Sequence, residues 1–130
     1  MIRGGDPQLA LPASRFATAC HRAPPHEPGG PLMRTSLRAA TRVRSSPRRH
    51  FHDGPLCGYV KQGTLSHFDA TCASDGVYAK GSALQEPAGP GNVHIGRDLG
   101  DVPLILTVLY VLPHGAPFSQ DAPNPGCPFE

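Results

Sequence analysis

The apolar positions of this chain gather in its second half. There, "LCGYVKQGTLSHFDA" predicts two short strands, Leu56 to Lys61 and Thr64 to Asp69, joined by a tight turn at Gln62-Gly63 where glycine tolerates a positive φ. The run from Leu104 to Leu112, "LILTVLYVL", predicts a long buried strand. Clusters of Gly, Pro, Asn and Ser separate the apolar runs at intervals of roughly 8–12 residues. This spacing predicts an all-β sandwich or barrel.

The first third of the chain lacks such a pattern. Residues 1–32 contain "APPHEPGGP" and show neither a helical nor a strand period, which predicts disorder. The stretch from Thr35 to Val43 has weak β character and could pair with a sheet edge. We therefore expect a disordered tail at residues 1–33, or a misassigned gene start with Met33 as the true one, followed by a β-barrel domain at residues 34–130.

Composition agrees with this division. A chain of 130 residues suits one domain with a hydrophobic core. It contains 15 Gly, 16 Pro and no Trp, and only 17% of its residues are charged. Such a composition disfavours long helices and favours a turn-rich β architecture.

Charge is distributed unevenly along the chain. Nine of the 12 basic residues lie in the first fifty positions, whereas acidic residues outnumber basic ones from Phe51 onward. Nucleic-acid-binding arms carry denser basic runs and, for single strands, interleaved aromatics, so a solvated tail is the better interpretation. No apolar run approaches the ~18 residues of a membrane span. A secretory signal is not recognisable either, and we expect a cytoplasmic protein.

Two histidines separated by one residue, His50 and His52, lie in "RRHFHDGP". On an extended strand, residues i and i+2 point to the same face, so both imidazoles can bind one metal ion through neutral nitrogens. Such a pair is common on protein surfaces. A metal site therefore needs a third ligand from elsewhere in the chain.

A resemblance to a known protein family identifies a candidate for the third ligand. The segments "HFHDGPLCGYVKQGTL" and "GSALQEPAGPGNVHIGRDLG" resemble the two motifs of the cupin superfamily, G-x5-H-x-H-x(3,4)-E-x6-G and G-x5-P-x-G-x2-H-x3-N. His50 and His52 match the paired histidines, and His94 matches the histidine of the second motif. The resemblance covers residues 47–130. It implies a jelly-roll or double-stranded β-helix barrel that binds one divalent metal ion, iron, manganese, nickel or zinc, through His50, His52 and His94.

The match departs from the cupin pattern at several positions. Arg44 replaces the opening glycine, Leu56 the carboxylate ligand and Asp98 the final asparagine, and two extra residues precede His94. Three neutral imidazoles without a carboxylate leave a divalent ion with about two positive charges, which should attract anionic chelating ligands.

Other residues near the motifs receive weaker assignments. We expect Glu86 to be an exposed turn carboxylate and His67 to be satisfied or solvent-facing rather than a ligand. Asp53 either orients a histidine or opens the Gly54-Pro55 turn. The tyrosines at strand positions, Tyr59 and Tyr78, should lie in the core.

The four cysteines show no C-x-x-C spacing, which argues against structural zinc. Cys57 should pack as a small hydrophobe. Cys72 and Cys127 lie in loops of the folded part, and we hypothesise a disulfide between them that would fix the C-terminal tail. A cytoplasmic location would instead keep both thiols reduced.

These features predict a small cupin that binds a divalent metal ion and acts on, or binds, a small polar or anionic molecule. Dioxygenase and isomerase chemistry are both open, and no catalytic residue or organic cofactor is assigned. The alternative is a non-enzymatic cupin that binds a ligand or a partner without metal. A small-molecule partner is expected, whereas membrane or nucleic-acid partners are not, and the sequence leaves a homodimer open.

Overall fold

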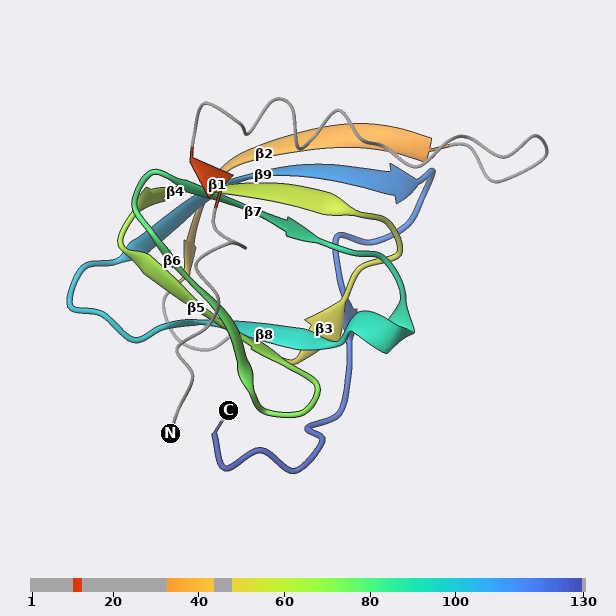
Figure 1. Cartoon of the computed structure of the whole chain (residues 1–130). Coiled ribbons are helices and arrows are strands. Elements are labelled where there is room, and N and C mark those ends of the chain that lie inside the picture. The colour runs from red at the N-terminus through yellow and green to blue at the C-terminus, as the bar shows by residue number, and fades with distance from the viewer. Residues whose placement is uncertain (1–10, 13–32, 44–47, 130) are drawn as a thin grey trace.

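The fold is known from a computed structural model, which describes residues 11–12, 33–43 and 48–129, the first two ranges by their backbone only. Ten antiparallel strands form two five-stranded sheets that face each other across the interior (Figure 1). The all-β jelly-roll barrel expected from the sequence is thus confirmed. Apart from the 3-10 turn η3 (Pro90–Asn92), the described residues contain no helix, and none that could cross a membrane.

The first sheet has the strand order β1-β7-β4-β9-β2. Its strands are β1 (Leu11–Pro12), β7 (Ser82–Glu86), β4 (Leu56–Gln62), β9 (Leu104–Pro113) and β2 (Met33–Val43). The segment with weak β character is therefore an edge strand beside β9, as predicted. The remainder of the expected tail, apart from Leu11–Pro12 and Met33, lies outside the described residues.

The second sheet has the order β10-β3-β8-β5-β6. Its strands are β10 (Gln120–Asp121), β3 (His50–Phe51), β8 (His94–Asp98), β5 (Thr64–Asp69) and β6 (Ser74–Ala79). The predicted tight turn joins β4 to β5, and Gly63 adopts a φ of 77°, a left-handed conformation that favours glycine. The proline-rich tail forms one short strand, β10, which pairs with β3.

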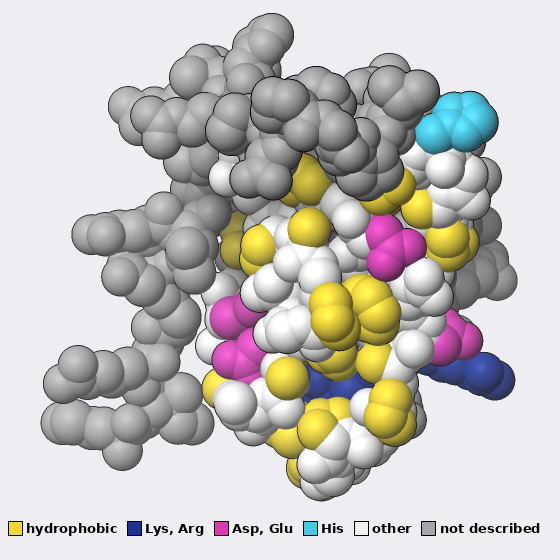
Figure 2. All heavy atoms as spheres, turned by 90° about the vertical axis from the view of Figure 1, so that its right-hand side faces the viewer, with side chains coloured by type: hydrophobic (Ala, Val, Ile, Leu, Met, Phe, Trp, Pro, Cys, Tyr) yellow, Lys and Arg dark blue, Asp and Glu magenta, His cyan; other side chains and the backbone are white. Residues whose placement is uncertain are grey.

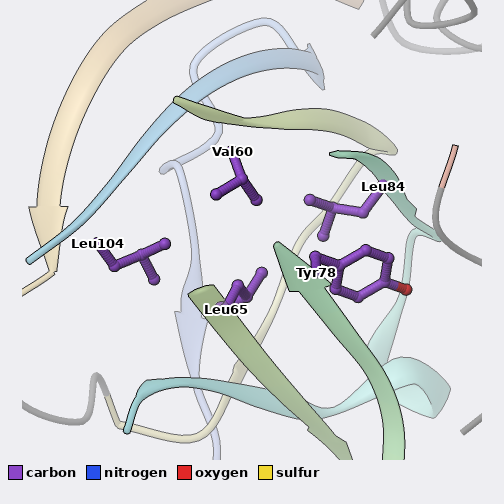
Figure 3. Packing of buried hydrophobic residues seen from close by; sticks show 5 residues of the cluster. All are labelled: Val60, Leu65, Tyr78, Leu84 and Leu104. Atoms are coloured by element: carbon purple, nitrogen blue, oxygen red, sulfur yellow. The ribbon is translucent and has the colours of Figure 1, made fainter. Parts of the chain in front are cut away.

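A hydrophobic core fills one part of the space between the sheets. Figure 3 shows Val60, Leu84 and Leu104 of the first sheet pointing toward Leu65 and Tyr78 of the second. All five are at most 6% exposed, so Tyr78 lies in the core as predicted. Each buried aliphatic side chain contributes about 1.5–3 kcal/mol. Tyr59 is only partly buried, so the expectation that it lies in the core was wrong.

A disulfide fixes the C-terminal tail to the second sheet. Cys72 and Cys127 are bonded, with their Cα atoms 5.5 Å apart, which confirms the hypothesised bridge. The fully buried Arg49 lies beneath it and donates hydrogen bonds to Cys127 Sγ (2.6 Å) and to the carbonyl of Asp69 (2.7 Å). Cys57 is buried as expected, and it is also disulfide-bonded.

Candidate metal centre

Three histidines and one glutamate meet between the sheets. His50 belongs to β3, His94 begins β8 and Glu86 ends β7, while His52 follows β3 directly. Register explains how residues distant in sequence meet, because His50 and His94 are direct partners of the antiparallel β3–β8 pair. The carbonyl of His52 accepts a hydrogen bond from the amide of Gly89 at 2.8 Å, which ties the H-x-H segment to the loop before η3.

The ligand atoms of this group are close together. One potential ligand atom from each of His50, His52, Glu86 and His94 lies within 4.8 Å of those from the other three. Glu86 Oε2 is 2.9 Å from His52 Nε2 and 3.0 Å from His94 Nε2. The structure thus brings together the three histidines predicted from the sequence. With Glu86, they form a group that could hold a metal ion.

Backbone carbonyls determine which nitrogen of each ring faces the centre. Nδ1 of His50, His52 and His94 lies 2.8, 2.6 and 2.8 Å from the carbonyl oxygens of Arg48, Phe118 and Asn92, respectively. A carbonyl oxygen only accepts hydrogen bonds, so each Nδ1 carries the proton. In the neutral imidazoles the lone pair is therefore on Nε2. This is the form in which a histidine binds a metal ion.

Two of these Nε2 atoms have no hydrogen bond. His52 and His94 are only 3% and 4% exposed, and their Nε2 atoms are buried without a partner of hydrogen-bonding geometry. Glu86 Oε2 is near enough, but it lies off the hydrogen-bonding direction. Buried polar atoms are rarely left without a partner, because their desolvation costs about 1–3 kcal/mol each. A cation among the lone pairs would satisfy them, so the residues fit a divalent metal ion.

The carboxylate of Glu86 is ionised. Burial alone would raise its pKa, but the imidazoles of His52, His67 and His94 outweigh burial and hold the pKa well below the ordinary value. Burial lowers the pKa of His50, as do His94 and His52, against the opposing effect of the hydrogen bond to the Arg48 carbonyl. An anionic glutamate and a neutral histidine are both suited to metal binding.

Glu86 and His67 do not lie where we expected them. Glu86 is not an exposed turn carboxylate, because its side chain is 12% exposed and belongs to the cluster. His67 is not solvent-facing, since it is 7% exposed and its Nε2 lies 3.3 Å from Glu86 Oε1. The alternation of side chains along a strand could have indicated both positions. Leu84 lies two residues before Glu86 on β7, and Leu65 lies two residues before His67 on β5. Both leucines are buried, and residues two apart on a strand point to the same face.

The inclusion of Glu86 also corrects the expected charge. With one carboxylate and three neutral imidazoles, a bound divalent ion would leave about one positive charge, not two. Asp53 accepts a hydrogen bond from Gln120 Nε2 at 2.9 Å rather than from a histidine.

A cavity of about 280 Å3 opens beside the cluster. Its walls are mainly apolar side chains of the barrel interior, and its mouth is lined by Arg48, Ser119 and Asp121. On the face shown in Figure 2, histidine reaches the surface at one place only among the described residues, which agrees with the burial of His52 and His94. The cavity borders all four residues of the cluster, so it offers a ligand a path to them.

The comparisons with known proteins support the fold of this chain and do not identify its function. No family model matches the chain, and no curated protein matches it. Among solved structures, protein NMB1881 from Neisseria meningitidis is 14% identical with a TM-score of 0.50, covering 72% of this chain and 94% of that one. The polyketide cyclase RemF from Streptomyces resistomycificus is 17% identical with a TM-score of 0.51, covering 75% of this chain and 67% of that one. The protein TT1209 from Thermus thermophilus is 20% identical with a TM-score of 0.46, covering 72% and 93%.

Proposed function

We propose that this chain is a small cupin that holds one divalent metal ion through His50, His52, His94 and Glu86, and that it binds a small molecule in the adjoining cavity. The observation that carries the proposal is the arrangement of the three imidazoles. Each is held at Nδ1 by a backbone carbonyl, while Nε2 is left for the centre beside an ionised carboxylate. Iron, manganese, nickel and zinc all accept imidazole and carboxylate ligands.

The chain's own residues would prepare this centre and shield it. The carbonyls of Arg48, Phe118 and Asn92 fix the rings and the protonation of Nδ1. The apolar cavity walls would exclude water from the ligand side. A bound divalent ion would supply Lewis-acid activation there, for dioxygenase or isomerase chemistry. The likeness in fold to a polyketide cyclase is compatible with a small-molecule cavity, although a fold by itself does not fix a function.

Elemental analysis of the purified full chain tests the metal. We expect close to one equivalent of a transition metal in the wild-type protein, and its loss in His94→Ala. His114→Ala is the matched control, because His114 is exposed and lies outside the cluster. Glu86→Gln keeps the shape of the side chain but removes its charge, and should weaken metal binding at least about 10-fold.

Two outcomes would refute the metal proposal. One is equal metal content in His94→Ala and the wild-type protein. The other is a folded wild-type protein that takes up none of the four metals on incubation. The second outcome would support the alternative, a cupin that binds its ligand without metal.

The cellular compartment is a separate question. A cytoplasmic location stays a prediction, and the Cys72–Cys127 disulfide favours an oxidising compartment instead. Alkylation of free thiols at the moment of cell lysis, followed by mass spectrometry, distinguishes the two. The oligomeric state also stays open, and sedimentation of the full chain distinguishes a monomer from a homodimer.

A further inference from the structure

The cavity beside the cluster has apolar walls. Five aliphatic side chains from four strands of the barrel line it: Leu56, Leu65, Leu84, Leu106 and Val108. The wall is also tightly packed at its glycines. A Cβ atom on Gly58 would lie 2.9 Å from Leu84 Cδ2, and one on Gly96 would lie 2.8 Å from Leu65 Cδ1. A ligand in this cavity would therefore lie against hydrocarbon on most of its surface.

Positive charge in the lining is limited to the mouth. Arg48 is the only lysine or arginine among the described residues that line the cavity. Its Nη1 lies 3.8 Å from Oδ2 of Asp121, and the side chains of Arg48 and Asp121 are 85% and 72% exposed, respectively. Apart from a metal ion that the cluster would hold, the described lining of the cavity interior therefore offers a ligand no cation.

The net charge of the centre then selects the ligand. A divalent ion with Glu86 and three neutral imidazoles has one positive charge, which a singly charged anion would neutralise. A doubly charged anion would keep one negative charge among apolar side chains, where an uncompensated charge is costly. Four protein ligands also leave two positions on a six-coordinate ion, enough for two oxygen donors from one molecule.

We propose that the cavity takes a singly charged oxygen chelator with an apolar body, and that it discriminates against compact dianions such as dicarboxylates. This inference rests on the proposed metal centre and narrows its substrate class. The apolar body would lie against the leucines and Val108, and the two oxygens would face the cluster. The expectation of a small polar or anionic ligand is thereby narrowed to an anion that is polar at one edge only.

Two probe molecules test the inference on the zinc-loaded full chain. Tropolone is a monoanionic chelator with an apolar ring, and oxalate is a compact dianionic chelator. Titration calorimetry gives the affinity of each for the loaded protein, and the same titration with free zinc corrects for their intrinsic chelating strength. After this correction we expect a preference for tropolone of at least about 10-fold.

Two variants test which part of the cavity causes the preference for tropolone. Val108→Thr keeps the side-chain shape and places a hydroxyl in the wall, so it should weaken tropolone binding several-fold and leave oxalate binding unchanged. Arg48→Gln tests the mouth and should change neither affinity by more than about two-fold, because the Arg48 side chain is mostly exposed and paired.

The outcomes separate the two proposals. A chain that takes up none of iron, manganese, nickel and zinc refutes the metal centre and this inference with it. A zinc-loaded chain that favours oxalate after correction, or that loses oxalate with Arg48→Gln, overturns only the ligand class. In that case the metal centre stands, and the mouth supplies the second positive charge.

Discussion

Nε2 of His67 lies 3.3 Å from Oε1 of Glu86, while the other oxygen of the same carboxylate, Oε2, faces His52 and His94. On its far side, His67 Nδ1 lies 2.5 Å from Asp75 Oδ1. Asp75, His67 and Glu86 therefore form a chain of polar contacts that runs from the half-exposed β6 to the cluster. A carboxylate held at one oxygen presents the other in a fixed direction, so we interpret His67 and Asp75 as residues that position Glu86.

Asp75→Asn tests this positioning. The substitution keeps the size of the side chain but removes the charge that faces His67. We expect the pKa of His67 to fall and the affinity for metal to decrease about 10-fold, because Glu86 would be held less firmly. NMR titration of the imidazole and a competition assay with a chelator measure the two effects. Asp101→Asn, in an exposed turn, is the matched control, and equal metal affinities in both variants would contradict the interpretation.

The same contacts predict a pH dependence of stability in the metal-free protein. Burial lowers the pKa of His67, but the hydrogen bonds with Asp75 and Glu86 outweigh it and raise the pKa from 6.5 to about 9. A group whose pKa is higher in the folded than in the unfolded state stabilises the fold. This stabilisation is fully present at pH values below the unfolded-state pKa, and it is lost as the pH rises through the folded-state pKa. The free energy of unfolding should thus fall by roughly 1–3 kcal/mol between pH 6.5 and pH 9.

Urea denaturation of the chelator-treated protein across this range measures the effect. His67→Gln is the reference, because it retains a polar side chain without a titrating group. Its stability should change less than that of the wild-type protein over the same interval. Parallel curves for the two proteins would show that His67 is not the group responsible.

The sequence predicted the parts of this site that depend on local geometry. His50 and His52 share a face because they are two residues apart on an extended chain. The meeting of His50 with His94 depends on the register of β3 against β8, and only the resemblance to cupins anticipated it. Apolar runs and glycine turns likewise predicted β4, β5 and β9 with bounds that differ by one residue at most.

The two polar residues that sequence reasoning misplaced, Glu86 and His67, are both largely shielded from solvent. Glu86 precedes a proline and a glycine, so composition suggested a turn, yet β7 extends to this residue and its alternation continues inward. His67 is buried with Asp75 at its Nδ1 and Glu86 3.3 Å from its Nε2, and both partners are eight or more residues away in sequence. Burial of a polar side chain depends on such partners, which a single sequence does not place in space.

Removal of the Cys72–Cys127 bridge should destabilise the protein strongly. The bridge joins residues 55 positions apart, and closing a loop of that length contributes ~4 kcal/mol in the chain-entropy model. We expect Cys72→Ser with Cys127→Ser to lower the midpoint of thermal unfolding by more than about 10 °C, at about 4–8 °C per kcal/mol. Differential scanning calorimetry measures this, and a midpoint equal to that of the wild-type protein would contradict a stabilising bridge.

The last prediction concerns the turn that follows the paired histidines. Gly54 is buried, and a Cβ atom there would collide with the carbonyl oxygen of Val111 in β9. The amide of Val111 also donates a hydrogen bond to the carbonyl of Pro55 at 3.0 Å, so this part of β9 cannot easily move away. Gly54→Ala should therefore displace the turn and destabilise the protein by about 1–3 kcal/mol.

Because His52 lies two residues before Gly54, the same displacement should also weaken metal binding. Gly91→Ala is the matched control: Gly91 is exposed in η3, and a Cβ atom there meets nothing within 4 Å. It should leave stability within about 0.5 kcal/mol and metal affinity unchanged. If Gly54→Ala binds metal as tightly as Gly91→Ala despite a loss of stability, the position of His52 does not depend on the contact between this turn and β9.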